Sequence, residues 1–395
     1  MHPMNAPDAS PRATALCGLV ALAAAMGIGR FAFTPILPMM QEGAGLGIAE
    51  GGWLASANYL GYLVGALSAM HVAVKQRFAI RAGLLTIALA TLAMGFSSSF
   101  AAWVVLRALP GFASAWVLVH VSTWSLERLE RAGRSGLDGA VFAGVGSGIV
   151  FAGLVCLALG NARLAYSDAW IALGAAAALA TAALWRRAGS AAQGPASDPG
   201  PHATPREIPE FWRLVFCHGA LGLGYIIPAT FLPVMAKQIV SDPLWFGWAW
   251  PVFGAAAVVS TLLASRLARL MAYRSVWILG NVVMAAGVLV PLVAPALAGI
   301  VLAAVCVGGT FMVNTMAGLQ EARRVAGPNA RILMAAMTSA FAVGQIAGPL
   351  LVSVLTRSRS GFSAALVAAA VPLVLAACVL SRKGENHEQW SVDRG

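Results

Sequence analysis

The chain has 395 residues, of which 59% are hydrophobic and 10% are charged, and its mean hydropathy is +0.79. This composition excludes an ordinary soluble globular protein and predicts a chain that lies in a lipid bilayer. The formal net charge of +11 suggests a polyanionic partner only if the basic residues cluster, so their placement decides what it means.

Apolar runs long enough to cross a bilayer recur over the whole length of the chain. A membrane-spanning helix needs about 20 mostly apolar residues. The two runs near Pro291 and Pro295 are separated by almost no polar sequence, so their boundary is the least defined. The pattern predicts an all-α polytopic membrane protein with twelve transmembrane helices, at residues 14–39, 51–72, 79–97, 100–124, 138–160, 168–185, 211–235, 244–264, 275–293, 295–319, 331–355 and 361–380.

The first run contains Arg30, which has no acidic residue within eleven positions on either side. The run is too long for a signal peptide and the next run follows almost at once. We therefore expect it to be retained as a helix, bent near its outer end by Pro35 and Pro38. A charge at membrane depth costs at least ~2.5 kcal/mol, so Arg30 should face a watery cavity or a partner. The alternative is that its side chain reaches up to the outer headgroups.

The fourth run contains a second charge, Arg107. Its position, seven residues after Phe100, places it about 10 Å below the outer surface, a depth similar to that of Arg30. The two arginines can therefore form one positive site, with Trp103 on the same helix face as Arg107. Reaching up to the headgroups is the alternative for Arg107 as well.

Two parts of the chain repeat each other at an offset of 195 residues. GIGRFAFTPILPMM at 27–40 aligns with GLGYIIPATFLPVM at 222–235, and two further short matches follow at nearly the same offset. The polar stretch 187–209, rich in Pro, Gly, Ala and Ser, predicts a flexible cytoplasmic linker. We therefore expect two parallel six-helix halves, 1–186 and 210–395, which is the architecture of the major facilitator superfamily (MFS).

The basic residues lie mainly on one side of the predicted membrane protein. With the N-terminus inside, twenty of the 26 Lys and Arg residues fall on the inner side and four on the outer side, while Arg30 and Arg107 lie within helices. This asymmetry follows the positive-inside rule, so we expect both termini in the cytoplasm. The positive charge therefore indicates topology, and no nucleic-acid partner is expected.

Three stretches resemble one family within that superfamily. GIGRFAFTPILPMM at 27–40, GWLASANYLGYLVGAL at 52–67 and GQIAGP at 344–349 are similar to the YbfB/YjiJ family of bacterial MFS transporters. The resemblance implies a multi-pass transporter of the cell inner membrane that acts as a monomer. One departure concerns residues 70–81, MHVAVKQRFAIR, which hold no carboxylate where many superfamily members carry an acidic gate motif.

Pairs of small residues four positions apart let membrane helices approach closely. In the superfamily arrangement the second run faces the eleventh and the fifth faces the eighth, so such pairs are candidates for gating surfaces between the halves. General helix packing is the alternative. The pairs are Gly61 and Gly65, Gly144 and Gly148, and Gly344 and Gly348.

Polar residues in the middle of apolar runs are candidates for lining the substrate path, and Tyr225 occupies the repeat position of Arg30. Each of the uncharged ones can instead form a hydrogen bond between helices. The candidate substrate-binding residues are Arg30, Arg107, Tyr225, Asn58, Trp103, Asn314 and Gln345.

The sequence also bears on how transport is driven. It holds no GxxxxGK[ST] phosphate loop, so symport or antiport is expected rather than ATP hydrolysis. The five cysteines lie in apolar runs without CxxC spacing, and neither a metal nor a cofactor is expected. Histidine is the side chain whose ordinary pKa lies near neutrality, so His120 and His218 are candidates for proton coupling, the alternative being buried neutral side chains.

All fifteen acidic residues lie in loops or near helix ends. An arginine without an acid favours an anionic substrate, because a guanidinium holds a carboxylate through two parallel hydrogen bonds. The sequence thus predicts a secondary transporter of a small organic anion. The alternative is efflux of apolar or aromatic compounds, with Arg30 structural and tryptophans along the path, namely Trp103, Trp116, Trp248 and Trp250. An enzyme or receptor would need catalytic acids, a metal set or a large soluble domain, none of which the sequence shows.

Overall fold

The structure is a computed structural model that describes residues 10–72, 74–187, 208, 210–239, 243–268, 270–294, 297–355 and 361–382. Every regular element within these ranges is a helix. The predicted linker at 187–209 lies almost entirely outside the described residues, so that prediction stays a prediction.

The helices follow one another with short connections. Their bounds are α1 (Pro11–Leu22), the π-helix η1 (Ala23–Ile28), α2 (Phe33–Ala44), α3 (Ile48–His71), α4 (Gln76–Met94), α5 (Phe100–Arg131), the short 3-10 turn η2 (Ser135–Leu137), α6 (Asp138–Asn161), α7 (Tyr166–Leu184), α8 (Phe211–Ile239), α9 (Pro243–Leu267), α10 (Tyr273–Val293), α11 (Leu297–Ala326), the 3-10 turn η4 (Gly327–Asn329), α12 (Ala330–Leu355) and α13 (Gly361–Ser381).

The described part of the chain contains ten candidate membrane spans, judged by length and hydropathy. One of them, Pro11–Ala44, combines α1, η1 and α2, and another, Ala298–Gly348, combines parts of α11 and α12. The helix α3 is not among the ten. α5 and α11 extend beyond the predicted ends at 124 and 319, because each continues past its apolar run with basic residues in the last turn, which the negative helix end favours.

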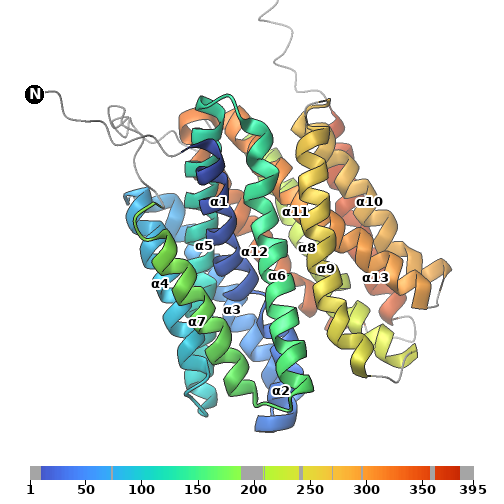
Figure 1. Ribbon diagram of the computed structural model, residues 1–395. Helices are drawn as coiled ribbons and strands as arrows, with labels where there is room; N and C mark the ends of the chain where they lie inside the picture. The colour runs from blue at the N-terminus through green and yellow to red at the C-terminus, as the bar shows by residue number, and fades with distance from the viewer. Residues whose placement is uncertain are drawn as a thin grey trace, which may run out of the picture.

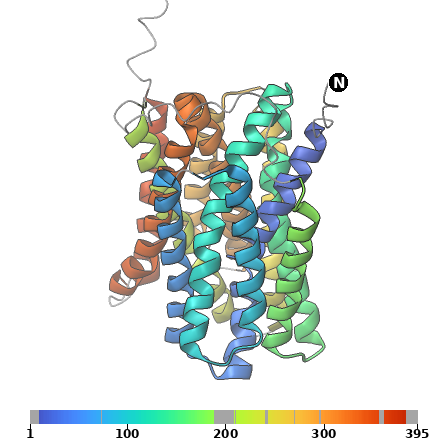
Figure 2. The ribbon, with the colours of Figure 1, turned by 90° about the vertical axis from the view of Figure 1, so that its left-hand side faces the viewer.

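The helices form one bundle, in which α1–α7 lie mainly on one side and α8–α13 on the other (Figure 1). We call these the first set and the second set. In the first set α3 packs on α5, α4 on α5 and α7, and α1 on α6 (Figure 2). In the second set α8 packs on α12 and α13, and α10 on α11 and α13. The main contacts between the sets are α6 with α9 and α3 with α12.

The three predicted glycine pairs all lie at close contacts within a set. A Cβ on Gly61 or Gly65 would clash with the backbone of α5, and one on Gly144 would clash with the backbone of α1. A Cβ on Gly148 would likewise meet the backbone of η1. Gly344 and Gly348 of α12 pack against α8. These contacts support the packing interpretation of the pairs rather than a place between the sets.

Other glycines lie at the contact between the two sets. A Cβ on Gly146 of α6 would lie 2.6 Å from the carbonyl oxygen of Gly254 of α9, and one on Gly254 would lie 2.8 Å from the carbonyl oxygen of Gly146. A Cβ on Gly153 would lie 2.7 Å from the Pro251 ring. The backbones of α6 and α9 therefore touch almost directly over this stretch.

The first predicted run is interrupted in its middle. α1 passes into η1, residues 29–32 form a turn, and α2 then begins at Phe33. Glycine is a weak helix former, and proline removes a backbone donor, so Gly27, Gly29 and Pro35 all favour an interruption here. The predicted bend at Pro35 and Pro38 differs from what is observed, because the interruption at 29–32 lies ahead of both prolines and Pro38 lies within α2. This interruption positions the candidate site.

Candidate substrate site

Arg30 lies in the turn at 29–32 and is only 4% exposed. Its Nη2 donates a hydrogen bond to Oε1 of Gln345 on α12, which joins the first set to the second. Its guanidinium carbon lies over the ring of Tyr62 on α3, 3.7 Å from the centroid. Nε and Nη1 of Arg30 have no hydrogen-bond partner. Within the described ranges no carboxylate forms a salt bridge with this arginine.

Gln345 adds a third unpaired donor beside Arg30. Its amide oxygen must face the guanidinium, because arginine has no acceptor, so its Nε2 carries the remaining N–H groups. This Nε2 is buried and has no partner. Buried donors without partners cost on the order of 1–3 kcal/mol each and are rare in folded proteins. Three of them lie at one place, and each can donate to an acceptor.

Arg107 of α5 has different surroundings from Arg30, although it is just as deeply buried, at 3% exposed. Its Nη1 lies 3.4 Å from the carbonyl oxygen of Gly29 and its Nη2 lies 3.3 Å from that of Arg30. Its guanidinium carbon is 4.7 Å from the ring centroid of Phe33 and 5.9 Å from that of Trp170. Arg107 thus binds the backbone of the interrupted helix.

The interruption explains why Arg107 is needed there. In a continuous helix the amide of Thr34 would donate to the carbonyl of Arg30, but it donates to the carbonyl of Phe31 at 3.3 Å instead. The freed carbonyl of Arg30 is therefore left for the guanidinium of Arg107. A side chain that replaces lost helix hydrogen bonds is the usual way in which an interrupted membrane helix keeps its polar groups satisfied.

Asn58 of α3 completes this support. Its Nδ2 donates to the carbonyl oxygen of Arg107 at 2.9 Å and lies 3.4 Å from that of Gly29. Asn58 is fully buried, and the backbone of α3 at this residue touches Gly111 of α5. Asn58 therefore ties together α3, α5 and the interruption, and holds the segment that carries Arg30.

A cluster of buried aromatic rings lies next to Arg30 and belongs mainly to the second set. The ring of Phe31, 5.5 Å from the guanidinium carbon of Arg30, makes edge contacts with Trp250 at 6.5 Å and Phe311 at 6.1 Å. Tyr225 stacks on Phe311 with centroids 5.1 Å apart. The ring cluster is formed by Phe31, Tyr225, Trp250, Phe253, Phe311 and Phe341.

Two predicted substrate-binding residues lie away from Arg30. Trp103 donates from its indole N–H to the carbonyl of Ser97 at 2.9 Å and packs edge-on against Tyr166, within the first set. Asn314 of α11 donates to Oδ1 of Asn281 on α10 at 3.2 Å, within the second set. Their stripes of polar residues therefore face neighbouring helices. None of the contacts that the structure gives them involves Arg30.

The two candidate histidines are buried in separate places. His120 of α5 has its Nδ1 2.9 Å from the carbonyl of Trp116, one turn back, and its Nε2 has no partner. His218 of α8 lies between the rings of Trp277 and Phe341, and its Nδ1 has no partner. Neither ring contacts Arg30 in the described structure.

The two sets are also tied together at the end of the bundle where α1 begins, at the top of Figure 1. Asp138, the first residue of α6, accepts hydrogen bonds from the hydroxyl of Tyr273 on α10 and, at 2.9 Å, from Nε2 of Gln320 on α11. Its side chain is fully buried. A carboxylate of one set is thus held by polar groups of the other set at this end.

A second tie at the same end involves α3 and α12. Nη1 of Arg331 donates to the carbonyl oxygen of Ala69 at 3.0 Å and to that of Val72 at 3.1 Å. Nearby helix ends are joined by a salt bridge between Arg323 of α11 and Glu130 of α5. Arg331 thus binds backbone carbonyls at the end of α3, around the start of the stretch 70–81 that lacks a carboxylate.

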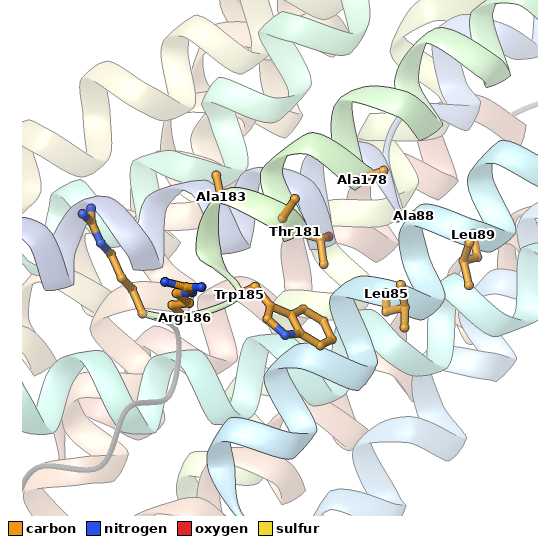
Figure 3. A pocket seen from close by; sticks show the side chains of 10 residues that line it. Leu85, Ala88, Leu89, Ala178, Thr181, Ala183, Trp185 and Arg186 are labelled. Carbon is orange, nitrogen blue, oxygen red and sulfur yellow. The ribbon is translucent and has the colours of Figure 1, made fainter.

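A pocket of about 750 Å³ lies elsewhere, between α4 and α7 on the flank of the bundle (Figure 3). Its lining includes Leu85 and Leu89 of α4, Thr181 of α7, and Trp185 and Arg186 just after α7. None of the predicted substrate-binding residues lines it. Because Leu85 and Leu89 are exposed on the outside of the bundle, this pocket is a groove on the apolar surface and not the candidate site.

Sequence reasoning found Arg30 and Gln345 but missed two of their neighbours, Phe31 and Tyr62. A signal for both was present, because Phe31 follows Arg30 directly, and Tyr59 and Tyr62 share a face of α3 three residues apart.

A family model described as an uncharacterised MFS-type transporter YbfB matches residues 22–381. No curated protein matches the chain.

Proposed function

The chain belongs to this family of MFS-type transporters, and from this premise we propose that it moves a small organic anion across the inner membrane by secondary transport. The family makes it a multi-pass membrane protein and a transporter rather than an enzyme. The observation that supports the anion is Arg30, whose Nε and Nη1 are buried without a partner beside an equally unpaired Nε2 of Gln345. A carboxylate accepts hydrogen bonds only and fits this set of donors.

The proposed architecture is that of two six-helix halves, 1–186 and 210–395, joined by the linker at 187–209. Twelve spans result if α1, η1 and α2 form one span, α11 and α12 form two, and α3 is included. The proposal places both termini in the cytoplasm, because the basic residues then follow the positive-inside rule. We propose a monomer in the lipid bilayer, without a nucleic-acid partner.

Alternating access requires the two sets to rock against each other around the site. In the proposed orientation the ties through Asp138 and Arg331 lie at the cytoplasmic end, so that end is closed. In this proposal Arg331 replaces the contact that the acidic gate motif makes in other superfamily members, because it binds the carbonyls of Ala69 and Val72 directly. The glycine contact of α6 with α9 offers a smooth surface about which the sets can rock.

Transport is driven in this proposal by symport or antiport. His120 and His218 each keep one buried ring nitrogen without a partner, and they are the proposed candidates for proton coupling. An exchange of one anion for another would need neither. Replacement of each histidine by glutamine would separate the two cases, because proton-coupled uptake driven by a pH gradient would stop while counterflow exchange would continue.

The experiment that tests the anion site compares two arginine variants of the purified full chain. Arg30→Gln should lose both binding and transport of every carboxylate, because it removes the charge. Arg77→Gln, the same change at an exposed position of α4, should keep both. Binding is measured as thermal stabilisation, which reaches about 2.7 kcal/mol at a ligand concentration of 100 times Kd.

The second candidate function is efflux of uncharged apolar or aromatic compounds. The ring cluster favours it, because rings of the second set meet Phe31 close to Arg30. If efflux of uncharged compounds is the function, Arg30→Gln would bind these compounds with the same affinity as the wild-type protein. Full carboxylate transport in Arg30→Gln, or collapse of its fold, would likewise count against the anion site and reassign Arg30 to a structural role.

A further inference from the structure

The unpaired N–H groups of Arg30 lie at the edge of its guanidinium, whereas the flat face of the group is covered by a ring. Tyr62 covers that face, with its ring centroid 3.7 Å from the guanidinium carbon. A ring over the face leaves the N–H groups at the edge free, and Nε and Nη1 are the two that lack acceptors. A ligand must therefore approach in the plane of the guanidinium, where a carboxylate oxygen can accept from Nε or from Nη1.

What lies beyond the carboxylate is set by the rings next to Arg30. Phe31 is 5.5 Å from the guanidinium carbon and makes edge contacts with Trp250 of α9 and Phe311 of α11. These contacts cross from the first set to the second. When the sets move apart in alternating access, these ring contacts break, and a ring of the substrate can replace them.

The ring cluster also contains an unpaired polar group. The indole Nε1 of Trp250 is buried and has no hydrogen-bond partner. The Trp250 ring contacts the ring of Phe31, which in turn lies next to Arg30. A substrate with a ring and an acceptor on that ring, far from its carboxylate, would use this donor as well.

We propose that the transported anion is an aromatic carboxylate. Its carboxylate binds Arg30 and Gln345, and its ring packs among Phe31, Trp250 and Phe311. This inference rests on the proposed function, because it assumes that Arg30 binds the anion. Aromatic rings prefer edge and offset contacts with one another, which a saturated ring of the same size cannot make. Selectivity for a planar ring over a saturated one follows.

The test uses three probes of similar size: benzoate, cyclohexanecarboxylate and the neutral benzamide. Binding to the purified full chain is measured by titration calorimetry and by thermal stabilisation. Benzoate should bind about tenfold more tightly than cyclohexanecarboxylate, from the ring contacts alone. Benzamide, which lacks the charge, should bind far more weakly than either. A benzoate with a hydroxyl group opposite the carboxylate should bind more tightly than benzoate, through Trp250.

Variants of Phe31 separate the ring contacts from stability. Phe31→Leu should remove the preference for benzoate over cyclohexanecarboxylate but leave the binding of the saturated acid nearly unchanged. Phe31→Tyr should restore the preference. Phe142→Leu removes a buried ring of α6 that makes none of the ring contacts with the cluster, and it should leave the preference intact. If the ring of Phe31 packs against the ring of the substrate, only Phe31→Leu among these three variants should change the preference for benzoate over cyclohexanecarboxylate.

The outcomes distinguish this inference from the proposed function. Equal affinity for benzoate and cyclohexanecarboxylate, both lost in Arg30→Gln, would overturn the aromatic preference and leave the anion site in place. Binding of benzamide as tightly as benzoate, unchanged in Arg30→Gln, would overturn both and favour efflux of uncharged compounds. Absence of carboxylate binding at millimolar concentration in the wild-type protein would also overturn both.

Discussion

Arg30 and Arg107 are buried to nearly the same degree, yet Arg107 donates to two backbone carbonyls whereas Arg30 donates to one side chain. Arg107 donates to the carbonyl oxygens of Gly29 and Arg30, which the interruption of the first span leaves free. Arg30 donates to Gln345 and keeps two nitrogens without acceptors. A buried cation that donates to a backbone freed by a helix interruption holds the fold, whereas one with two unpaired nitrogens beside an unpaired amide can bind a ligand; Arg107 keeps only its Nε without a partner. Changes to the partners of each arginine should therefore act on different properties of the protein.

The largest effect is expected from Gln345→Glu. A carboxylate at this position would pair with Arg30 and occupy the donors that the substrate needs, so anion affinity should fall about 100-fold or more. The melting temperature of the ligand-free protein should stay the same or rise, because the buried charge gains a partner. Calorimetric titration and thermal unfolding of the same preparations measure both quantities.

Gln345→Met serves as the control for that variant, because it removes the amide without adding a charge. It should weaken anion binding by about 1 kcal/mol, as expected for the loss of one neutral hydrogen bond. If Gln345→Glu bound anions as well as the wild type, Arg30 would not be the anion site.

A smaller effect, on stability instead of affinity, is expected from Arg107→Leu. This change leaves the carbonyl of Arg30 without a donor and that of Gly29 with only Asn58, so the free energy of unfolding should fall by about 2 kcal/mol. Arg30→Leu, the matched change at the other arginine, should leave ligand-free stability near the wild-type value. Thermal unfolding at matched detergent and lipid content gives the difference between them.

The opposite order, with Arg30→Leu the less stable variant, would exchange the roles of the two arginines. Equal losses would mean that both arginines hold the fold, and the anion site would have to be sought elsewhere in the chain.

The smallest effect is expected from Asn58→Ala. Asn58 donates to the carbonyl of Arg107 at 2.9 Å and more weakly to that of Gly29, so its loss should cost about 1 kcal/mol of stability. Anion binding should weaken only to the extent that the interruption becomes mobile. Hydrogen exchange of the segment 29–34 measures that mobility, and unchanged exchange in Asn58→Ala would show that Arg107 alone holds the interruption.

The helices could be predicted from the sequence because a single apolar run that crosses lipid satisfies its backbone hydrogen bonds by forming a helix. The bounds differ mainly where α5 and α11 continue with charged turns beyond the apolar run. Arg30 stood out for a similar reason, since a charge within an apolar run is costly and calls for an explanation. These inferences depend only on local sequence.

The partners within the site could not be predicted in the same way. Gln345 lies 315 residues from Arg30, and only tertiary packing brings them together. The role of Arg107 depends on carbonyls that a continuous helix would not expose, so it follows from the interruption and not from its own position. Trp103 and Asn314 lie on polar stripes that suited a cavity, but a stripe does not state which neighbour it faces.

The long separation between Arg30 and Gln345 has a consequence for biosynthesis. A helical hairpin that contains Arg30 enters the bilayer before α5 or α12 has been made, so the charge is inserted without Arg107 bound to its backbone or Gln345 bound to its side chain. Without these partners, the arginine adds at least ~2.5 kcal/mol to the free energy of inserting this span. We expect the span Pro11–Ala44 to insert inefficiently alone and more efficiently in a chain extended through α5, as glycosylation mapping of truncated chains would measure. Arg30→Leu should insert fully at either length. In the wild-type chain, Arg30 would then reach its final buried position only after α12 has been synthesised.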